Sequence, residues 1–474
     1  MATTYDVRVH EIHRRYDNGA KKPTRYIVRW SVDRKRGERG FKRSTQADSF
    51  RSELMTAARK GEPFDIGSGL PLSMLRPEQT DTTWFDLVTA HCAARWDELS
   101  PGSRRNLVRD LSDVTIALLP AHRSRPDRPV LSKALRIAFN PKRDAEPSAE
   151  IADAVTWVKR HGGAVRALED VDVFRRLMTA LDKKGDGTRA APDTIRLRRT
   201  ALVGVIDYAI EKEALSFNPL RKVRVRKNKT ALREIETAAV VSPMQARTLL
   251  NAVRENSPRL VAFFGLMYFG GLRPEEAVNV RKSNLSLPSA NWDDTHQRWV
   301  FPDGVDGRGE LRLERAVPEI SGEWTDSGER HEERSLKGRG EKDTRTVPCW
   351  PDLTILLHDH LRQFGTTPDG HLFWGVRSGG RLSSSVYGRV WESARAETFT
   401  AELYASTLGK RPYDLRHACV SGWLAAGVEP TRVAYWAGHS VAVLMKVYAK
   451  FVDGGQAIAL RRVEDWLGRG PDQS

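Results

Sequence analysis

The sequence predicts a multidomain protein that is mainly α-helical and carries small β-sheets. The chain has 474 residues, enough for about three domains at roughly 150 residues each. Apolar residues alternate clearly only near the N-terminus, whereas over most of the remaining chain they recur at helical spacing. Two stretches rich in proline, glycine or basic residues separate these regions. We therefore expect domains at residues 1–62, 80–228 and 235–474.

The first region is expected to form a three-stranded sheet with one helix. Polar and apolar residues alternate over residues 24–32, as they do in a strand with one buried face. Shorter runs at 5–9 and 40–45 predict the other two strands, and the apolar spacing over 46–60 predicts the helix. Residues 61–77 are expected to be a linker.

The charge balance points to a polyanionic partner. Lys and Arg number 77 against 61 Asp and Glu, a formal net charge of +16. Residues 1–60 alone hold 16 basic and 7 acidic residues, a net of +9. Such a surplus favours nucleic acid over an anionic membrane. The longest apolar stretch, residues 260–272, is shorter than the ~20 residues of a membrane helix.

Cysteine usage excludes two further classes of protein. The three cysteines are few and far apart, which excludes a disulfide scaffold and fits a reducing cytoplasm. No group of Cys and His residues has the spacing of zinc ligands.

Residues 80–228 are expected to be mostly helical. The clearest helix follows Pro192, and the polar, proline-rich residues 120–150 are expected to form an inserted loop. Residues 221–229 then contain six basic residues in nine. This run is either a solvated linker or a linker that follows a phosphate backbone, and we favour the second because it joins two folded regions. The candidate DNA-binding residues are Arg29, Lys42 and Arg43 in the first region, and Arg221, Lys222, Arg224, Arg226 and Lys227 here.

The third region starts with a helix whose N-terminus is visible in the sequence. Ser242 and Gln245 have the spacing of a capping box, with proline at the first helical position. Residues 284–348 are richer in turns and strand-like pieces, and 284–334 is long enough to contain an insertion. Helical patterns return from residue 352. A helix expected over 456–467 packs either on its own domain or on a neighbouring protomer.

Four short motifs in this region contain residues that could carry chemistry. Together they hold two arginines, a histidine and a tyrosine, namely Arg273, Arg416, His439 and Tyr448. Guanidinium groups stay protonated and can grip two oxygens of a phosphodiester. A tyrosine can attack phosphorus and form a covalent phosphotyrosine, but its ordinary pKa of ~10 requires nearby positive charge. Arginines can stabilise the transition state electrostatically, so such a site requires no metal.

The spacing of these motifs is informative. Tyr413 precedes Arg416 by three residues, so one helix face would present both. His439 follows Arg416 by 23 residues, and Tyr448 follows His439 by nine. With Gly271-Leu272-Arg273-Pro274-Glu275-Glu276, Asp414-Leu415-Arg416-His417 and Gly438-His439-Ser440, this pattern resembles the tyrosine recombinase (phage integrase) family.

The resemblance extends to the domain organisation. It implies a helical (SAM-like) core-binding domain at 80–228 and a mixed α+β tyrosine recombinase catalytic domain at 235–474. The small N-terminal domain is similar to the arm-type DNA-binding domains of many integrases.

The resemblance also implies a role for each matching residue. Arg273 and Arg416 would hold the scissile phosphate, and His439 would hydrogen-bond a non-bridging oxygen. Tyr448 would attack, become linked to the 3′-phosphate and free a 5′-hydroxyl.

Other positions matter for the same reaction. The family uses a lysine on a β-hairpin as general acid, and residues 335–348 are expected to form that hairpin, with Lys337 as the acid and Lys342 as the alternative. Tyr413 stands where the family usually has histidine, so a phosphate contact is expected there but the base function is in doubt. Glu276 is expected to support the first arginine, and His417 to be a buried structural histidine.

The resemblance implies a site-specific DNA recombinase, an integrase that integrates or excises a mobile element without metal, ATP or other cofactor. Its expected partners are double-stranded DNA attachment sites, three further copies of itself in a homotetramer on DNA, and an accessory DNA-bending or directionality factor. No membrane partner is expected, and the expected location is cytoplasmic, at the nucleoid. The alternatives are an Xer-like chromosome-dimer resolving recombinase, a type IB topoisomerase-like enzyme, and a sequence-specific DNA-binding protein without catalysis.

Overall fold

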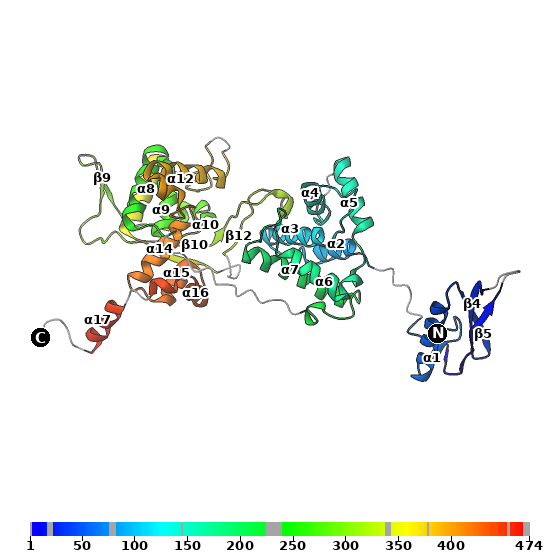
Figure 1. Cartoon of the computed structure of the whole chain (residues 1–474). Helices are drawn as coiled ribbons and strands as arrows, with labels where there is room; N and C mark the ends of the chain where they lie inside the picture. The colour runs from blue at the N-terminus through cyan, green and yellow to red at the C-terminus, as the bar shows by residue number, and fades with distance from the viewer. Residues whose placement is uncertain are drawn as a thin grey trace.

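The structure, a computed structural model, describes residues 2–16, 22–74, 82–143, 146–223, 239–336, 343–376, 379–452 and 456–467, without the side chains of 449–459. The described residues fold into three regions that follow one another along the chain (Figure 1). Each region has a large hydrophobic core of its own, and a fourth, small cluster joins α4 to α5 in the second region. Most described elements are helices and the sheets are small. The fold class predicted from the sequence is therefore confirmed.

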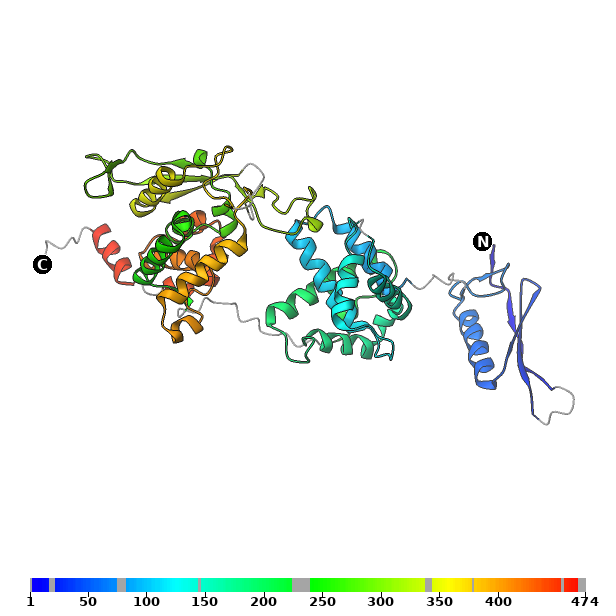
Figure 2. The ribbon, with the colours of Figure 1, turned by 90° about the horizontal axis from the view of Figure 1, so that it is seen from above.

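The N-terminal domain is a twisted sheet with one helix packed on it (Figure 2). Its elements are β1 (Thr3–Thr4), β2 (Val7–Val9), β3 (His13–Arg15), β4 (Arg25–Val32), β5 (Lys35–Phe41), α1 (Ser44–Arg59) and β6 (Phe64–Asp65). Within the described residues this sheet has four strands, not the expected three: β2 and β3 pair with one edge of the central strand β4, and β5 pairs with the other edge, at 35–41 instead of 40–45. Val28, Trp30 and Val32 on β4 are buried against Phe50 and Leu54 of α1, as the alternation predicts.

Part of the segment expected to be a linker belongs to this domain. β6 pairs with β1, and Phe64 is fully buried in the domain core. The indole N–H of Trp30 donates a hydrogen bond to the carbonyl of Gly69. A buried indole N–H needs an acceptor of this kind. The hydrogen bond therefore holds the segment that follows β6 against the sheet.

The second domain is helical throughout. Its elements are α2 (Trp84–Arg95), α3 (Pro101–Leu118), α4 (Arg128–Ala138), α5 (Ala149–His161), η1 (Val165–Glu169), α6 (Val171–Leu181), α7 (Pro192–Glu211) and η2 (Pro219–Arg221). The loop predicted over 120–150 is wrong, because α4 occupies its middle and α5 begins in it. Leu131, Ala134 and Leu135 are buried at helical spacing, and Pro129 sits in the first turn, where proline is tolerated.

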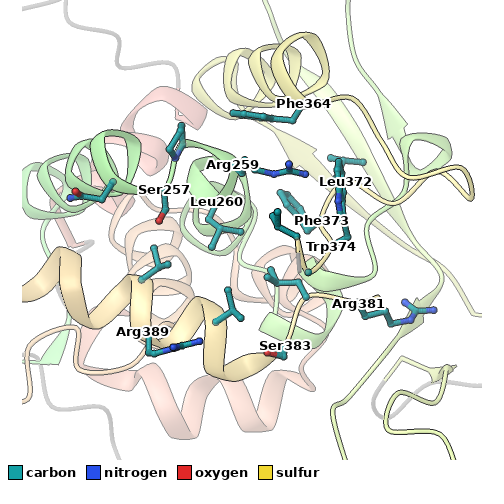
Figure 3. A pocket seen from close by; sticks show the side chains of 17 residues that line it. Ser257, Arg259, Leu260, Phe364, Leu372, Phe373, Trp374, Arg381, Ser383 and Arg389 are labelled. Atoms are coloured by element: carbon teal, nitrogen blue, oxygen red, sulfur yellow. The ribbon is translucent and has the colours of Figure 1, made fainter. Parts of the chain in front are cut away.

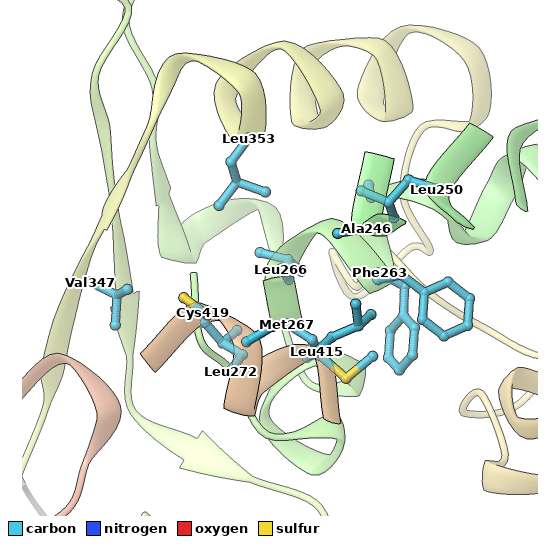
Figure 4. Packing of buried hydrophobic residues seen from close by; sticks show 14 of the residues in the cluster. Ala246, Leu250, Phe263, Leu266, Met267, Leu272, Val347, Leu353, Leu415 and Cys419 are labelled. Carbon is cyan, nitrogen blue, oxygen red and sulfur yellow. The ribbon is translucent and has the colours of Figure 1, made fainter. Parts of the chain in front are cut away.

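The third domain packs helices around a nearly apolar helix, α9 (Figure 4). Its helices are α8 (Pro243–Asn256), η4 (Pro258–Leu260), α9 (Val261–Phe269), α10 (Pro274–Val278), η5 (Lys282–Asn284), α11 (Pro351–Phe364), α12 (Ser384–Thr398), α13 (Ala401–Ala405), α14 (Asp414–Ala425), α15 (Pro430–Ala437), α16 (Val441–Val452) and α17 (Gln456–Trp466). α8 starts with the predicted capping box, since Ser242 and Gln245 exchange side-chain to backbone hydrogen bonds of 3.3 and 2.9 Å.

Short strands lie between α10 and α11. They are β7 (Leu285–Ser286), β8 (Asn291–Asp293), β9 (Arg298–Val300), β10 (Gly309–Leu313), β11 (Arg315–Ala316), β12 (Arg334–Ser335) and β13 (Arg345–Cys349). β10 is the middle strand of the sheet β13-β10-β7, and β8 and β9 form a hairpin.

A segment of the third domain reaches the second domain (Figures 1 and 2). This segment, residues 317–331, connects β11 to β12 through η6 (Gly322–Trp324), and we call it the strap. Trp324 is buried in the core of the helical domain, where its ring centre lies 6.1 Å from that of Trp96. The buried guanidinium of Arg104 donates to the carbonyl of Trp324 at 3.1 Å and to both oxygens of Asp326 at 2.9 and 3.0 Å. Part of the expected insertion thus joins the two domains.

The C-terminal helix α17 leaves its apolar side in solvent. Leu460, Val463 and Trp466 are all exposed, and the Trp466 side chain is 84% accessible. Packing of this helix on its own domain, one of the two expectations, is therefore not observed. None of the described helices is both long and apolar enough to cross a membrane.

Candidate functional site

The residues of the four motifs converge in the third domain. Arg273 immediately precedes α10, Arg416 lies in the first turn of α14, His439 follows α15, and Tyr448 lies in α16. Nη2 of Arg416 is 2.9 Å from Nε2 of His439, and the His439 ring is stacked on the Tyr448 ring with centres 6.3 Å apart. The tertiary structure thus brings together side chains that the sequence spreads over 175 positions.

Two glycines let the backbone approach these arginines. Gly271 and Gly438 both have left-handed backbone angles, with φ of 61° and 62°. A side chain at Gly438 would collide with Nη1 of Arg345, and one at Gly271 would press against the ring of Trp423. The glycines in the Gly-Gly-Leu-Arg and Gly-His motifs are therefore required by both conformation and space.

Arg416 is fully buried and is held mainly by the backbone. Its Nη1 donates to the carbonyl of Gly271, and its Nη2 donates to the carbonyl of Ala437 and to His439. Its Nε–H is buried without a partner among the described residues. A buried donor left unpaired costs about 1–3 kcal/mol, so this group is suited to an acceptor that binds here.

Glu276 holds the arginines in place. Its Oε1 accepts from Nη1 of Arg273 at 2.7 Å, as the sequence predicts for a supporting role, and from Nη1 of Arg345 at 3.0 Å. Burial raises the pKa of Glu276, but the attraction of Arg345, Arg273 and Arg416 together outweighs it and lowers the pKa to about 2. The carboxylate is therefore ionised throughout the neutral range.

Arg345 is the residue of this site that sequence reasoning missed. It is completely buried on β13 and donates to both oxygens of Glu276. Its partner lies 69 positions away, so no local pattern pairs the two residues. The available signal is that Arg345 stands in register with Val347 and Cys349, on the buried face of the strand.

His439 is held in one neutral form. Burial and then the charges of Arg416, Arg273 and Arg345 lower its pKa to about 3. Because the arginine at Nε2 can only donate, Nε2 accepts and the ring proton lies on Nδ1. Nδ1 is buried without a partner among the described residues, so His439 offers a second unpaired donor beside Arg416.

Tyr448 lies at a kink in α16. Its backbone angles (φ −119°, ψ 16°) depart from the helix, and its side chain is fully buried. Its Oη is 2.7 Å from Nδ1 of His417. Burial raises the pKa of Tyr448, and the positive charge of Arg416 offsets this only in part. In this structure the phenol is protonated at neutral pH.

His417 and Tyr413 differ from their expected positions. His417 is half-buried and contacts Tyr448, whereas we expected a buried structural histidine. Tyr413 sits just before α14 with helical backbone angles, and its ring meets the His417 ring edge-on at 5.0 Å. Contact of Tyr413 with a phosphate remains a prediction.

The lysine hairpin is not formed as expected. Lys337 and Lys342 lie outside the described residues. β12 pairs with β11, and β13 pairs with β10. Within the described residues the two flanks of the expected hairpin therefore pair with residues 309–316 and not with each other, so the hairpin predicted over 335–348 is wrong in its strand pairing.

The candidate DNA-binding residues lie at exposed positions where they are described. Arg29 on β4 is 3.3 Å from Glu38 on β5, which partly neutralises it. Lys42 and Arg43 are exposed just before α1. Arg221 and Lys222 are exposed at the end of the helical domain, with Nζ of Lys222 3.6 Å from the ring centre of Phe217. Arg224, Arg226 and Lys227 lie outside the described residues.

The third domain also contains a cavity of about 640 Å³ (Figure 3). It is lined by aliphatic, aromatic, polar and basic residues, and the guanidinium carbon of Arg259 lies 4.0 Å from the ring centre of Trp374. None of its lining residues belongs to the motif site, so the two are separate. Across the described ranges, no group of three or more His, Cys, Asp or Glu residues could hold a metal ion.

The sequence matches no protein-family model and no curated protein. Among solved structures, the chain is similar to the Tn1549 transposon integrase in complex with a circular intermediate DNA, with 15% identity and a TM-score of 0.47 over 74% of this chain and 99% of that chain. It is similar to the XerH site-specific recombinase bound to its difH substrate, with 12% identity and a TM-score of 0.39 over 77% of this chain and 96% of that chain. The catalytic domain of bacteriophage HP1 integrase has 19% identity and a TM-score of 0.28 over 48% of this chain and 95% of that chain.

Proposed function

We propose that this chain is a site-specific DNA recombinase of the tyrosine recombinase family, of the integrase type. One observation carries the proposal: the Tyr448 phenol lies in the same buried site as Arg273, Arg416 and His439. These groups provide a nucleophile, fixed positive charge and unpaired hydrogen-bond donors, which are what phosphodiester attack requires.

The arginines and the histidine would bind the scissile phosphate. Within the described part of the chain no group accepts from the buried Nε–H of Arg416 or the Nδ1–H of His439, so both are suited to its non-bridging oxygens, with Arg273 adding charge. Glu276 and the backbone carbonyls keep these groups in place before DNA arrives, so little reorganisation is needed in the transition state.

Tyr448 would then attack phosphorus. A bond forms between its Oη and phosphorus while the bond to the 5′-oxygen breaks, which leaves a 3′-phosphotyrosine and a 5′-hydroxyl. Attack by a 5′-hydroxyl of another strand reverses the step and joins new partners. The energy of the phosphodiester is conserved in the phosphotyrosine, so no ATP is needed, and Lys337 is the proposed general acid.

The other domains fit a role in holding attachment sites. Residues 80–474 would surround the core site, and the N-terminal domain, whose residues 1–60 carry +9 of the net charge of +16, would bind an arm site. This additional basic domain favours an integrase of a mobile element over a compact chromosome-dimer resolving enzyme. On DNA we propose a homotetramer, with the exposed face of α17 available to a neighbouring copy.

A suicide substrate tests the proposal. A nicked duplex carrying the attachment site that flanks the gene is incubated with the protein, and the covalent adduct is measured on a denaturing gel. We expect an adduct with the wild-type protein and none with Tyr448→Phe, whereas Tyr404→Phe, a tyrosine on α13, reacts as wild type. An adduct that persists in Tyr448→Phe would overturn the assignment of the nucleophile.

A further inference from the structure

The nucleophile contacts a histidine to which the sequence motifs assign no chemical role. Oη of Tyr448 is 2.7 Å from Nδ1 of His417, and the two rings are 5.8 Å apart between centres. The contact joins α14 to α16, so the same helix carries both a phosphate-binding arginine and this histidine. The geometry is that of a hydrogen bond along which a proton can move.

Attack by Tyr448 requires that its proton leave. Burial raises the pKa of the phenol above its ordinary value, and Arg416 counteracts this only in part. A phenol in this state is a weak nucleophile, so a neighbouring group has to take the proton as the bond to phosphorus forms.

Three other titratable groups of the site are poor proton acceptors. The pKa of His439 is lowered to about 3 by burial and by three arginines, and its Nε2 already accepts from Arg416. The carboxylate of Glu276, with a pKa of about 2, is neutralised by its arginines. Tyr413 is itself a phenol, and near pH 7 a neutral phenol is a poor base.

His417 differs from these groups in two ways. It contacts the reacting oxygen directly, and it is only half-buried, so an imidazolium there is not confined to a closed apolar core. Two ionisable side chains lie against its ring: Tyr413, edge-on at 5.0 Å between ring centres, and Tyr448 on α16 at 5.8 Å. An ordinary imidazole is an efficient base near neutral pH.

We propose that His417 is the general base that takes the proton of Tyr448 during cleavage. This inference rests on the proposed function. The proton moves from Oη to Nδ1 as the Oη–phosphorus bond forms and the bond to the 5′-oxygen breaks. The departing oxygen takes a proton from an ammonium group or from water. In the joining step the imidazolium returns its proton to the phenolate as Tyr448 leaves. His417 thus performs the base function that is in doubt at Tyr413.

The test uses the full chain in single-turnover cleavage of the nicked attachment-site duplex between pH 5.5 and 9. His417→Asn places an acceptor oxygen near the position of Nδ1 but cannot take up the proton. We expect a loss of cleavage rate of about 100-fold or more at pH 7, the usual contribution of a general base, with unchanged DNA binding. The wild-type rate should rise with pH through one ionisation and level off, whereas the variant rate should still be rising at pH 9.

Rescue and matched controls separate a chemical role from a structural one. Cleavage by His417→Ala should increase with added imidazole, in proportion to the free-base concentration. His296→Asn, on the exposed turn between β8 and β9, should keep wild-type kinetics. Tyr413→Phe should retain the wild-type pH profile.

The outcomes distinguish this inference from the proposed function. If the wild-type protein forms an adduct and His417→Asn matches its rate and pH profile, His417 is not the base and only this inference fails. This inference alone also fails if the ionisation in the pH profile of the cleavage rate disappears in Tyr413→Phe but persists in His417→Asn. If the wild-type protein forms no adduct, the proposed function fails and the inference fails with it.

Discussion

Oε2 of Glu276 lies 2.7 Å from Nη2 of Arg345, and both side chains are excluded from solvent. The same carboxylate also binds Arg273, so one negative charge sits among three guanidinium groups when Arg416, at 3.9 Å, is included. The site therefore keeps a strong net positive charge, but the arginines are fixed in position by a buried partner.

Glu276→Gln should destabilise the third domain and abolish cleavage. Removal of one member of a buried ion pair leaves an uncompensated charge, which typically costs about 3–5 kcal/mol. The measurement is hydrogen exchange of α10 and β13, together with adduct formation. The neighbouring Glu275→Gln, at a half-buried position, is the control and should change neither.

A double variant checks this explanation. Replacing Glu276 and Arg345 together by leucine removes both charges, so it should recover part of the stability lost in Glu276→Gln. A double variant that is less stable than Glu276→Gln would contradict the assignment of the loss to an unpaired Arg345.

Arg416→Lys should still bind DNA but cleave it slowly. Lysine keeps the charge, but a single ammonium cannot reach the carbonyls of Gly271 and Ala437 together with His439 as the guanidinium does. Loss of a preorganised donor costs about 100-fold or more in rate. Single-turnover cleavage and a DNA-binding assay measure the two effects. Arg411→Lys, an exposed arginine just before α14, is the matched control, and equal rates for the two variants would rule out this role.

His439 should remain neutral well below the ordinary pKa of histidine. Its folded pKa of about 3 lies below its value of 6.5 in an unfolded chain, so proton binding favours unfolding. The stability it contributes is complete above pH 6.5 and is lost as the pH falls towards 3. NMR titration of histidine-labelled protein, with the resonance assigned by its absence in His439→Asn, should show no protonation between pH 7 and 4. A titration midpoint of His439 near pH 6.5 would show that burial and the neighbouring arginines do not lower its pKa.

Trp324→Ala in the strap should loosen the helical domain. Its ring belongs to the core that contains Trp96, so its truncation leaves a cavity that costs about 3–5 kcal/mol. Hydrogen exchange in α3 should become faster, although the substituted residue belongs to another domain in sequence. Trp299→Ala, in the β8–β9 hairpin of the third domain, should leave α3 unchanged. Unaltered exchange in α3 after Trp324→Ala would show that the strap does not support that domain.

Local signals predicted much of the fold. The alternation over residues 24–32 correctly predicted β4, and the capping box at Ser242 correctly predicted the start of α8. Both signals are local, because the strand period and the helix cap depend on neighbouring residues. The loop predicted over 120–150 failed where polar composition concealed the buried face of α4. The hairpin over 335–348 failed because its flanks pair with a strand about 20 to 40 residues earlier, which no local pattern reveals.

By itself, the sequence determined which residues are present for phosphodiester chemistry, since Arg273, Arg416, His439 and Tyr448 stand in motifs whose residue types and spacing can be seen along the chain. Only the tertiary structure decided what surrounds them. Arg345 meets Glu276 across 69 positions, His417 meets Tyr448 across 31, and Arg104 meets the strap across 220. Contacts of this kind depend on how elements pack in three dimensions, and a single sequence carries no local periodicity that encodes them.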